Sequence, residues 1–187
     1  IDGLYNEKYD YPPEVMLSRS FFNEHQKDFY KFYKDKLNCL DIEPNVTHKY
    51  LKMLEDKGKL SAIVTQNIDG LHEKAGNKNI YLLHGTIYKN HCMMCGKEYD
   101  ASYVFNSKDI VPRCKCKGII KPDVVLYEEG LDEDTVNGTI NAISNADMLI
   151  IGGTSLVVYP AASFVRYFKG KYLVIINKDA TDYDRNA

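Results

Sequence analysis

The chain is expected to fold as an α/β protein with a doubly wound parallel sheet and a smaller lobe that carries a metal module. Two observations predict the sheet: short runs that are apolar on both faces recur along the chain, and stretches with helical spacing separate them. A third observation predicts the smaller lobe, because four of the five cysteines cluster within residues 92–116 and interrupt this alternation.

The first 45 residues indicate helices and irregular structure, with a helix start at Ser18. A second helix is expected to begin at Asn45 and to end near Gly58, because glycine commonly follows a helix C-terminus. It should bury one apolar face, which consists of Val46, Tyr50, Leu51 and Leu54. Beyond it we expect buried strands at 60–64, 80–83, 124–127, 148–151 and 172–176, and helices at 71–75, 132–146 and 160–168.

Composition and charge argue against several classes of protein. A chain of 187 residues that is 44% hydrophobic can bury a sizeable core. The net charge of −2 and the pI near 6.2 argue against a nucleic-acid backbone as the partner. No run approaches the roughly 18 apolar residues of a membrane span, and no signal peptide opens the chain. We therefore expect a cytoplasmic enzyme with no membrane partner and no direct nucleic-acid partner.

The clustered cysteines predict a structural zinc site with the ligands Cys92, Cys95, Cys114 and Cys116. They form one Cys-x2-Cys pair and one Cys-x-Cys pair, and each pair can fill two corners of a tetrahedron. Four soft thiolates suit Zn²⁺ and leave no open coordination position, so the metal is expected to be a scaffold. Gly96 and Gly118 follow the pairs and would let the backbone turn toward the ion. The alternatives are four unrelated buried thiols or a redox pair.

Polar segments follow several predicted strands, at the edge where parallel sheets bind ligands. Asn67 and Asp69 follow the first strand and could converge with His84, which follows the second. The His84 imidazole has the near-neutral pKa that a general base requires. The small residues of Gly152–Ser155 would let a dinucleotide approach the backbone, and Asn177 could hold a ribose hydroxyl. Each segment alone also fits a turn, a helix cap or a structural histidine, but the set predicts a dinucleotide site.

The chain resembles a sirtuin, a member of a family of NAD-dependent protein-lysine deacylases. The most specific match is the run from Thr65 to His72, which reads Thr-Gln-Asn-Ile-Asp-Gly-Leu-His. The other matching segments keep the family's order and cover essentially the whole chain. They are Gly3-Leu4-Tyr5, Pro44-Asn45 with His48, Ala75-Gly76, Leu83-His84-Gly85, the four cysteines, Lys121 to Tyr127, Gly153-Thr154-Ser155, Val158 to Ala162 and Ile176-Asn177.

The resemblance implies a Rossmann-like NAD-binding domain at 46–85 and 123–187, a helical part of the small lobe at 1–45 and a zinc-binding module at 86–122. NAD and an acetyl-lysine protein or peptide would bind between the lobes. In this family the acyl oxygen attacks C1′ of the NAD ribose as nicotinamide leaves. A histidine then activates a ribose hydroxyl, and hydrolysis gives free lysine and O-acyl-ADP-ribose.

The resemblance also implies roles for individual residues. His84 would be the catalytic base. The cofactor would be bound by Gln66, Asn67, Ile68, Asp69, Gly153, Thr154, Ser155, Asn177, Lys178 and Asp179. The acyl-lysine side chain or the peptide backbone would be contacted by Val125, Tyr127 and Val158.

The sequence departs from the family in three places. In the family, a glycine-rich cofactor segment would lie before Ile1, and a last strand and helix would lie after Ala187. Residues 1–187 without these segments are therefore expected to bind NAD poorly and to turn over little substrate. Sirtuins that prefer succinyl or malonyl lysine carry a Tyr-x-x-Arg pair where this chain has Tyr30-Lys31-Phe32-Tyr33, which favours uncharged acyl groups, acetyl first. The usual Phe-Gly-Glu reads Tyr127-Glu128-Glu129, and the added carboxylate either favours basic substrates or is a solvated surface charge.

Three other functions fit parts of this pattern. Mono-ADP-ribosyl transfer also begins by displacing nicotinamide, and the sequence does not separate it from deacetylation. A zinc-ribbon module that binds nucleic acid or protein is disfavoured by the acidic balance and by the lack of interleaved basic and aromatic residues. A catalytically silent NAD sensor is disfavoured because His84, Asn67 and Asp69 are all present.

Overall fold

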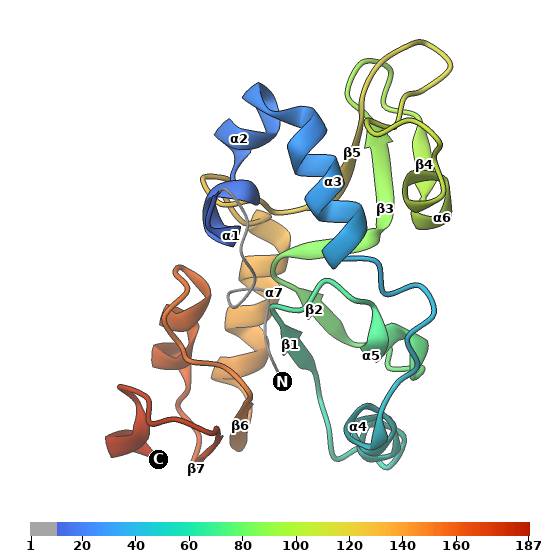
Figure 1. Ribbon diagram of the computed structural model, residues 1–187. Coiled ribbons are helices and arrows are strands. Elements are labelled where there is room, and N and C mark those ends of the chain that lie inside the picture. Colours follow the sequence, from blue (N-terminus) through green and yellow to red (C-terminus); the bar gives the residue numbers. More distant parts are fainter. Residues whose placement is uncertain (1–10) are drawn as a thin grey trace.

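The structure of the protein, a computed structural model, describes residues 11–187 and has two lobes (Figure 1). The expected Gly3-Leu4-Tyr5 match and the start of the 1–45 segment lie outside the described residues. One lobe contains helices α1–α3 and α6 with strands β3–β5, and the other contains the remaining helices and strands. Among residues 11–187 we see no helix with the length and apolar character needed to cross a bilayer.

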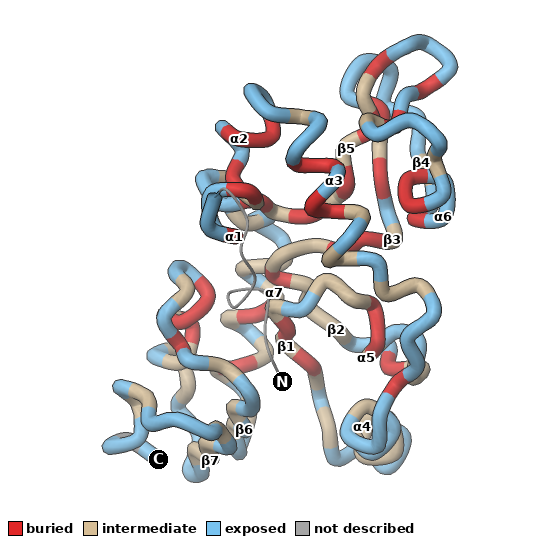
Figure 2. Tube along the Cα trace, viewed as in Figure 1, coloured by how far each residue is buried: buried red, intermediate tan, exposed pale blue. Residues whose placement is uncertain are grey.

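Three helices build the first lobe, namely α1 (Pro13–Met16), α2 (Arg19–Glu24) and α3 (Gln26–Lys36). Ser18 caps α2 as predicted, because its hydroxyl accepts a hydrogen bond from the Phe21 N–H at 3.2 Å. One face of α3 is fully aromatic and buried, and it consists of Phe29, Tyr30, Phe32 and Tyr33. In Figure 2 this buried face lies next to β3, so the helices and the cysteine-rich sheet share one core.

The helices pack on an antiparallel sheet with the strand order β4-β3-β5. The expected strand at 124–127 is wrong in position and in partner, because the observed strand ends at Val124 and pairs antiparallel with β3. The apolar residues beyond Val124 leave the sheet and are held by backbone hydrogen bonds to other elements. The elements of this module are β3 (Gly85–Cys92), β4 (Glu98–Asp100), α6 (Ala101–Phe105) and β5 (Ile120–Val124).

The second lobe contains parallel strands, which confirms the predicted α/β class. Strand β1 (Ile63–Thr65) pairs with β2 (Ile80–Leu82), and β6 (Met148–Gly152) pairs with β7 (Tyr172–Ile176). Within residues 11–187 these are two separate hydrogen-bonded pairs. The helices of this lobe are α4 (Val46–Asp56), α5 (Leu71–Lys74), α7 (Glu133–Ser144) and the 3-10 helices η2 (Ala161–Tyr167) and η3 (Asp184–Asn186).

A second, smaller core lies where α7 and η2 pack together. Its buried members are Leu83, Ile143, Ala161 and Phe164. Leu83 follows β2 and directly precedes His84, so this core supports the strand end that leads into the site. The helix expected at 160–168 is present, with 3-10 geometry.

Helix α4 begins where the sequence predicts. The Asn45 side chain accepts hydrogen bonds from N–H groups of the first turn, and the His48 imidazole accepts one from the Asn45 N–H, which completes a capping box. The expected buried face of this helix is wrong within the described residues. Val46 is 73% exposed and Tyr50 is 61% exposed.

Candidate active site and zinc centre

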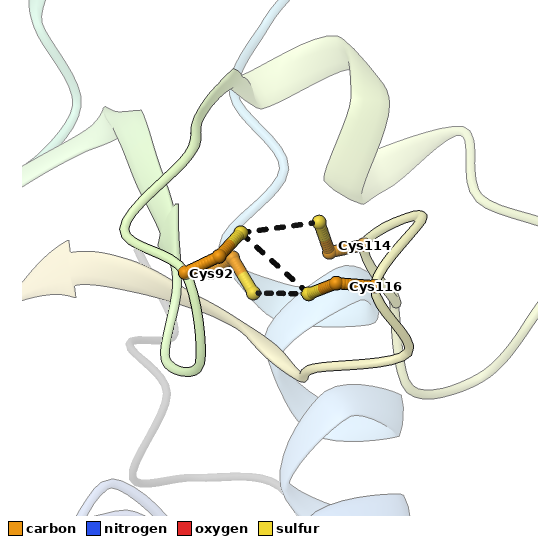
Figure 3. A group of neighbouring side chains, drawn as sticks. Cys92, Cys114 and Cys116 are labelled. Carbon is orange, nitrogen blue, oxygen red and sulfur yellow. Dashed lines mark hydrogen bonds between the residues drawn. The ribbon is translucent and has the colours of Figure 1, made fainter.

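Four cysteine sulfurs meet at the end of the antiparallel sheet. Cys92 ends β3 and Cys95 follows in the next turn, while Cys114 and Cys116 come from the loop before β5 (Figure 3). All four Sγ atoms lie within 4.8 Å of one another, with Cys92 to Cys116 at 3.4 Å and Cys95 to Cys114 at 3.7 Å. Four sulfurs at about 2.3 Å from a tetrahedral zinc lie about 3.8 Å apart, so this set fits one zinc ion.

Backbone turns bring each pair of cysteines to the ion. Gly96 takes a left-handed turn after the first pair (φ +70°), as predicted. After the second pair the left-handed residue is Lys117 (φ +70°) and not Gly118. Gly118 is needed for a different reason, because a Cβ at this position would lie 2.5 Å from the Cys92 sulfur. The close approach of the thiolate leaves no room for a side chain there.

Tyr99 of β4 lies beside the cysteines and was missed by the sequence prediction. Its hydroxyl donates a hydrogen bond to the Cys114 sulfur at 3.0 Å. This bond lowers the pKa of the Cys114 thiol to about 6, which favours the thiolate that binds zinc. No sequence signal marks this tyrosine, because its place near Cys114 depends on how β4 pairs with β3.

The ends of β1 and β2 bring Gln66 and His84 together. Thr65 pairs with Leu82 at the end of the parallel ladder, so the residues that follow both strands emerge at one edge of the sheet. The His84 Nδ1 atom lies 3.1 Å from the Gln66 carbonyl oxygen. The segments that follow β1 and β2 therefore meet, as expected for parallel strand ends, and the contact is made by Gln66.

The hydrogen bond to Gln66 fixes the tautomer of the His84 ring. A carbonyl oxygen only accepts, so Nδ1 carries the proton and Nε2 keeps its lone pair. Burial lowers the pKa of His84 below its ordinary value, and the hydrogen bond to the Gln66 carbonyl opposes this shift without reversing it. The half-buried ring is therefore neutral at pH 7 and can accept a proton at Nε2, as a general base does.

The backbone on the C-terminal side of His84 is held tightly. The Val125 N–H donates to the His84 carbonyl at 3.0 Å, and Gly85 pairs with Val124 across the sheet. Gly85 is left-handed (φ +72°), and a Cβ at this position would lie 2.0 Å from the Asp123 carbonyl oxygen. Only glycine fits at this position, so it is a structural requirement of the site.

The predicted cofactor residues after β1 form a turn that leads into α5. The Asp69 carboxylate accepts a hydrogen bond from the Leu71 N–H at 3.0 Å and so satisfies the first turn of the helix. Asn67 is exposed, whereas Gln66, Ile68 and Asp69 are half-buried. The turn therefore presents Asn67 to solvent at the edge that also carries His84.

The second parallel pair brings Gly153 and Asn177 to one edge. Gly152 pairs with Ile176, and the Gly153 N–H donates to the Ile176 carbonyl at 3.0 Å. Gly153 is exposed and left-handed (φ +63°), with open space where a side chain would be. The two residues that follow it, Thr154 and Ser155, are half-buried and exposed respectively.

A pocket of about 170 Å³ lies at the end of β7, and its lining includes Asn177 and Asp179. The Asn177 amide donates to the Asp179 carbonyl at 2.9 Å, which shapes the turn after the strand. Lys178, the third residue predicted here, is exposed and does not line this pocket.

The predicted substrate residues lie on two segments. Val125 is half-buried after β5, and Tyr127 is 38% exposed. The Tyr127 N–H donates to the Leu17 carbonyl, and its own carbonyl accepts from the Arg19 N–H, both at 3.0 Å. Val158 is half-buried in the segment before η2.

Comparison with known proteins identifies the family. A model of the Sir2 family matches residues 1–160. A Clostridium acetobutylicum protein named NAD-dependent protein deacetylase is 58% identical over 189 aligned positions, which cover 100% of this chain and 77% of the relative. A Clostridium tetani protein of the same name is 54% identical, with 100% of this chain and 76% of the relative covered. The chain belongs to the Sir2 family.

Solved Sir2 structures have the same fold as this Sir2 chain. A Sir2 bound to acetylated peptide is 38% identical, with a TM-score of 0.86, and the match covers 92% of this chain and 75% of that one. A Sir2 complex with a p53 peptide and NAD⁺ is 37% identical, with a TM-score of 0.87, and covers 99% of this chain and 79% of that one. The parallel strands and the four-cysteine module are therefore those of a Sir2 fold.

Proposed function

We propose that this Sir2 protein is an NAD-dependent protein-lysine deacetylase. The observation that carries the proposal is the neutral His84 ring, in which Nδ1 donates to the Gln66 carbonyl and Nε2 is unprotonated, in a chain 58% identical to a protein named for this activity. The products would be nicotinamide, O-acetyl-ADP-ribose and free lysine. A solved Sir2 complex with 2′-O-acetyl-ADP-ribose and a deacetylated p53 peptide supports this product set.

His84 acts as the general base in this proposal. NAD, when bound, supplies the ribose carbon that receives the acetyl oxygen and the ribose hydroxyl that needs deprotonation. Nε2 of His84 accepts that proton, while the Gln66 carbonyl keeps the ring oriented through Nδ1. Burial keeps the ring neutral and ready to accept a proton at physiological pH.

The two strand edges fit a dinucleotide. Gly153 has open space in place of a side chain, which suits close approach of a ligand to the backbone. Asn177 and Asp179 line a polar pocket on the same edge. We assign the nicotinamide side to Gln66, Asn67, Ile68 and Asp69, and the adenosine side to Gly153, Thr154, Ser155, Asn177, Lys178 and Asp179.

We assign the acyl-lysine peptide to the segments that contain Val125, Tyr127 and Val158. Tyr30 and Tyr33 are fully buried in α3, and the sequence Tyr30-Lys31-Phe32-Tyr33 contains no arginine to bind an acyl carboxylate. The Tyr30 hydroxyl donates to the Ile120 carbonyl. An uncharged acyl group, acetyl first, is the substrate that this arrangement favours. A solved Sir2 structure with a propionylated peptide is consistent with uncharged groups in the family.

The zinc ion is structural in this proposal, since all four positions of a tetrahedral site are filled by cysteine sulfurs. We divide the chain into a helical part at 1–45, a zinc-binding module at 86–122 and an NAD-binding domain at 46–85 and 123–187. We place the enzyme in the cytoplasm, acting on acetylated proteins or peptides.

The decisive experiment incubates the full-length protein, which includes the family's glycine-rich cofactor segment, with NAD and an acetyl-lysine peptide and identifies the products by mass spectrometry. Deacetylated peptide and O-acetyl-ADP-ribose are expected in equal amounts. His84→Ala should lower the rate by about 100-fold or more, the usual contribution of a general base. His25→Ala is the matched control, because this histidine is exposed at the start of α3.

Zinc content and circular dichroism show that each variant is folded. Equal rates for the full-length protein and its His84→Ala variant, or no product from the folded full-length protein, would contradict the proposal. ADP-ribose attached to the peptide without loss of acetyl would favour mono-ADP-ribosyl transfer instead.

A further inference from the structure

Glu128 has an unusual backbone for a residue with a side chain. It directly follows the proposed substrate residue Tyr127, and its φ of +74° lies in the left-handed region that favours glycine. The related motif of the family has glycine at this position. A side chain that persists in an unfavourable backbone conformation needs a compensating contact.

The Glu128 carboxylate supplies that contact. Its Oε2 atom accepts a hydrogen bond from the Ser20 N–H at 2.9 Å, and its Oε1 atom accepts one from the Ser20 hydroxyl, also at 2.9 Å. Ser20 lies in the first turn of α2, where N–H groups have no partner within the helix. Both carboxylate oxygens are therefore engaged with one residue that is 108 positions away in the sequence.

The segment before Glu128 is attached to two parts of the molecule. At one end the Val125 N–H donates to the His84 carbonyl, and at the other end Tyr127 exchanges two backbone hydrogen bonds with Leu17 and Arg19. The bonds from Glu128 extend this second attachment by one further residue of α2. The position of α2 and the position of His84 are thus linked through three residues.

Glu129, the next residue, has a separate role. Its Oε2 atom accepts hydrogen bonds from the Leu126 N–H at 2.9 Å and from Lys121 Nζ at 3.3 Å. Within residues 11–187, Glu129 therefore binds only residues of the same segment of the chain. Glu129 stabilises the shape of the turn, whereas Glu128 connects the turn to the helix. The two adjacent carboxylates are therefore not interchangeable.

We propose that Glu128 is a positioning residue for the acyl-peptide substrate, and this inference rests on the proposed deacetylase function. By holding the turn to Ser20, Glu128 fixes the segment Val125–Tyr127 as a rigid edge beside His84. Peptide that binds this edge meets a segment that is already ordered, so less freedom is lost on binding. Both oxygens bind Ser20, so the role we assign to the carboxylate is to hold the turn and not to recognise the charge of the peptide.

Steady-state kinetics with an acetyl-lysine peptide and NAD test this role. Glu128→Ala should raise the KM for peptide by about three- to tenfold, the range expected for losing an exposed charge-assisted pair, and leave kcat and the KM for NAD within about twofold. Glu128→Gln should rescue the KM, because its amide oxygen accepts from the Ser20 N–H and its NH₂ group donates to the Ser20 hydroxyl. Ser20→Ala, the matched control on the helix, removes one of the two bonds and should have a smaller effect.

Glu128→Gly separates the side chain from the backbone. It relaxes the left-handed strain but loses both bonds, so the peptide KM should stay raised; a KM equal to that of the parent protein would overturn the proposal. An unchanged peptide KM in Glu128→Ala, or no rescue by glutamine, would also overturn it. So would a Glu128→Gln enzyme that changes its preference between basic and acidic peptides, because that result indicates direct recognition of charge.

Hydrogen exchange separates this inference from the proposed function. Exchange of the Ser20 and Tyr127 amides should speed up in Glu128→Ala and not in Glu128→Gln, whether or not the protein deacetylates any peptide. Unchanged exchange in Glu128→Ala would overturn the contact itself. Changed exchange in a protein that turns over no substrate would instead place the failure in the proposed function.

Discussion

Alanine in place of Gly85 is expected to destabilise the protein far more than alanine at another left-handed glycine. Gly85 and Gly58 have similar φ values, +72° and +65°. A Cβ at position 58 meets nothing within 4 Å, whereas one at position 85 lies 2.0 Å from the Asp123 carbonyl oxygen. The two substitutions therefore share the cost of the backbone conformation and differ in the steric cost.

The expected losses of folding free energy can be worked from these contacts. The left-handed conformation costs an alanine about 1 kcal/mol at either position. At position 85, β5 must also move away, which breaks the Val125–His84 hydrogen bond and the pairing of Gly85 with Val124, at about 1 kcal/mol each. Loosened packing of the buried Val124 adds about 1 kcal/mol. We expect a loss of about 4 kcal/mol for Gly85→Ala and about 1 kcal/mol for Gly58→Ala.

Urea unfolding of the zinc-loaded protein, followed by circular dichroism, measures both losses. Thermal unfolding provides a second measurement. In a chain of this length each 1 kcal/mol of lost stability lowers the thermal midpoint by about 2–4 °C, so the midpoint should fall by roughly 8–16 °C in Gly85→Ala and by roughly 2–4 °C in Gly58→Ala. Equal losses of folding free energy in the two variants would refute this reasoning, because they would mean that the steric contact with the Asp123 carbonyl oxygen does not destabilise the protein.

Tyr33→Phe is expected to stabilise the protein by about 1 kcal/mol, because the Tyr33 hydroxyl is buried without a hydrogen-bond partner among the described residues; a lower thermal midpoint would contradict this. The value of kcat/KM should fall as pH drops through the lowered pKa of His84 and be flat above about pH 7. A value of kcat/KM that is constant down to about pH 5 would rule out His84 as the general base. The folded state disfavours the protonated His84 ring, so this residue also lowers the stability of the protein as pH falls below the ordinary histidine pKa of 6.5. Tyr99→Phe should speed zinc transfer to a coloured chelator by about tenfold, and an unchanged release rate would show that its hydrogen bond does not retain the metal. Removal of zinc should expose the Cys92 amide to hydrogen exchange while the Val125 amide stays protected, and equal loss of protection would contradict this.

The sequence predicts best those elements whose signals are local. Ser18 and Asn45 cap helices as expected because a cap bonds to residues two or three positions ahead. The strand expected at 172–176 occupies those residues, since a run of apolar β-formers bounded by polar residues needs no knowledge of its neighbour. The run at 124–127 has the same local appearance, but only Val124 belongs to a strand, because the backbone bonds of Val125 and Tyr127 go to His84 and to the residues around Ser18.

The site divides in the same way. The cysteine cluster and the meeting of the segments after β1 and β2 could be predicted, because short spacing and parallel strand ends bring them together, although the observed partner of His84 is Gln66 and not the expected Asn67 or Asp69. Glu128 and Tyr99 could not, because each acts on a residue whose proximity depends on tertiary packing. The sequence marks Glu128 only as a departure from a motif, and its contact with α2 determines whether the added charge faces substrate or protein.

Strand β3 joins His84, the proposed catalytic base, to the cysteine cluster and explains how the metal can be structural. The strand begins at Gly85, next to His84, and ends at the zinc ligand Cys92. Its pairing with β5 shifts register between Gly85 and Asn90, so the two ends are hydrogen-bonded separately. The end beside His84 is held by Val125 and by the fit of Gly85, and neither contact involves a thiolate. Loss of zinc should therefore first destabilise the lobe that contains the cysteines. The backbone around His84 should change only after that lobe has unfolded.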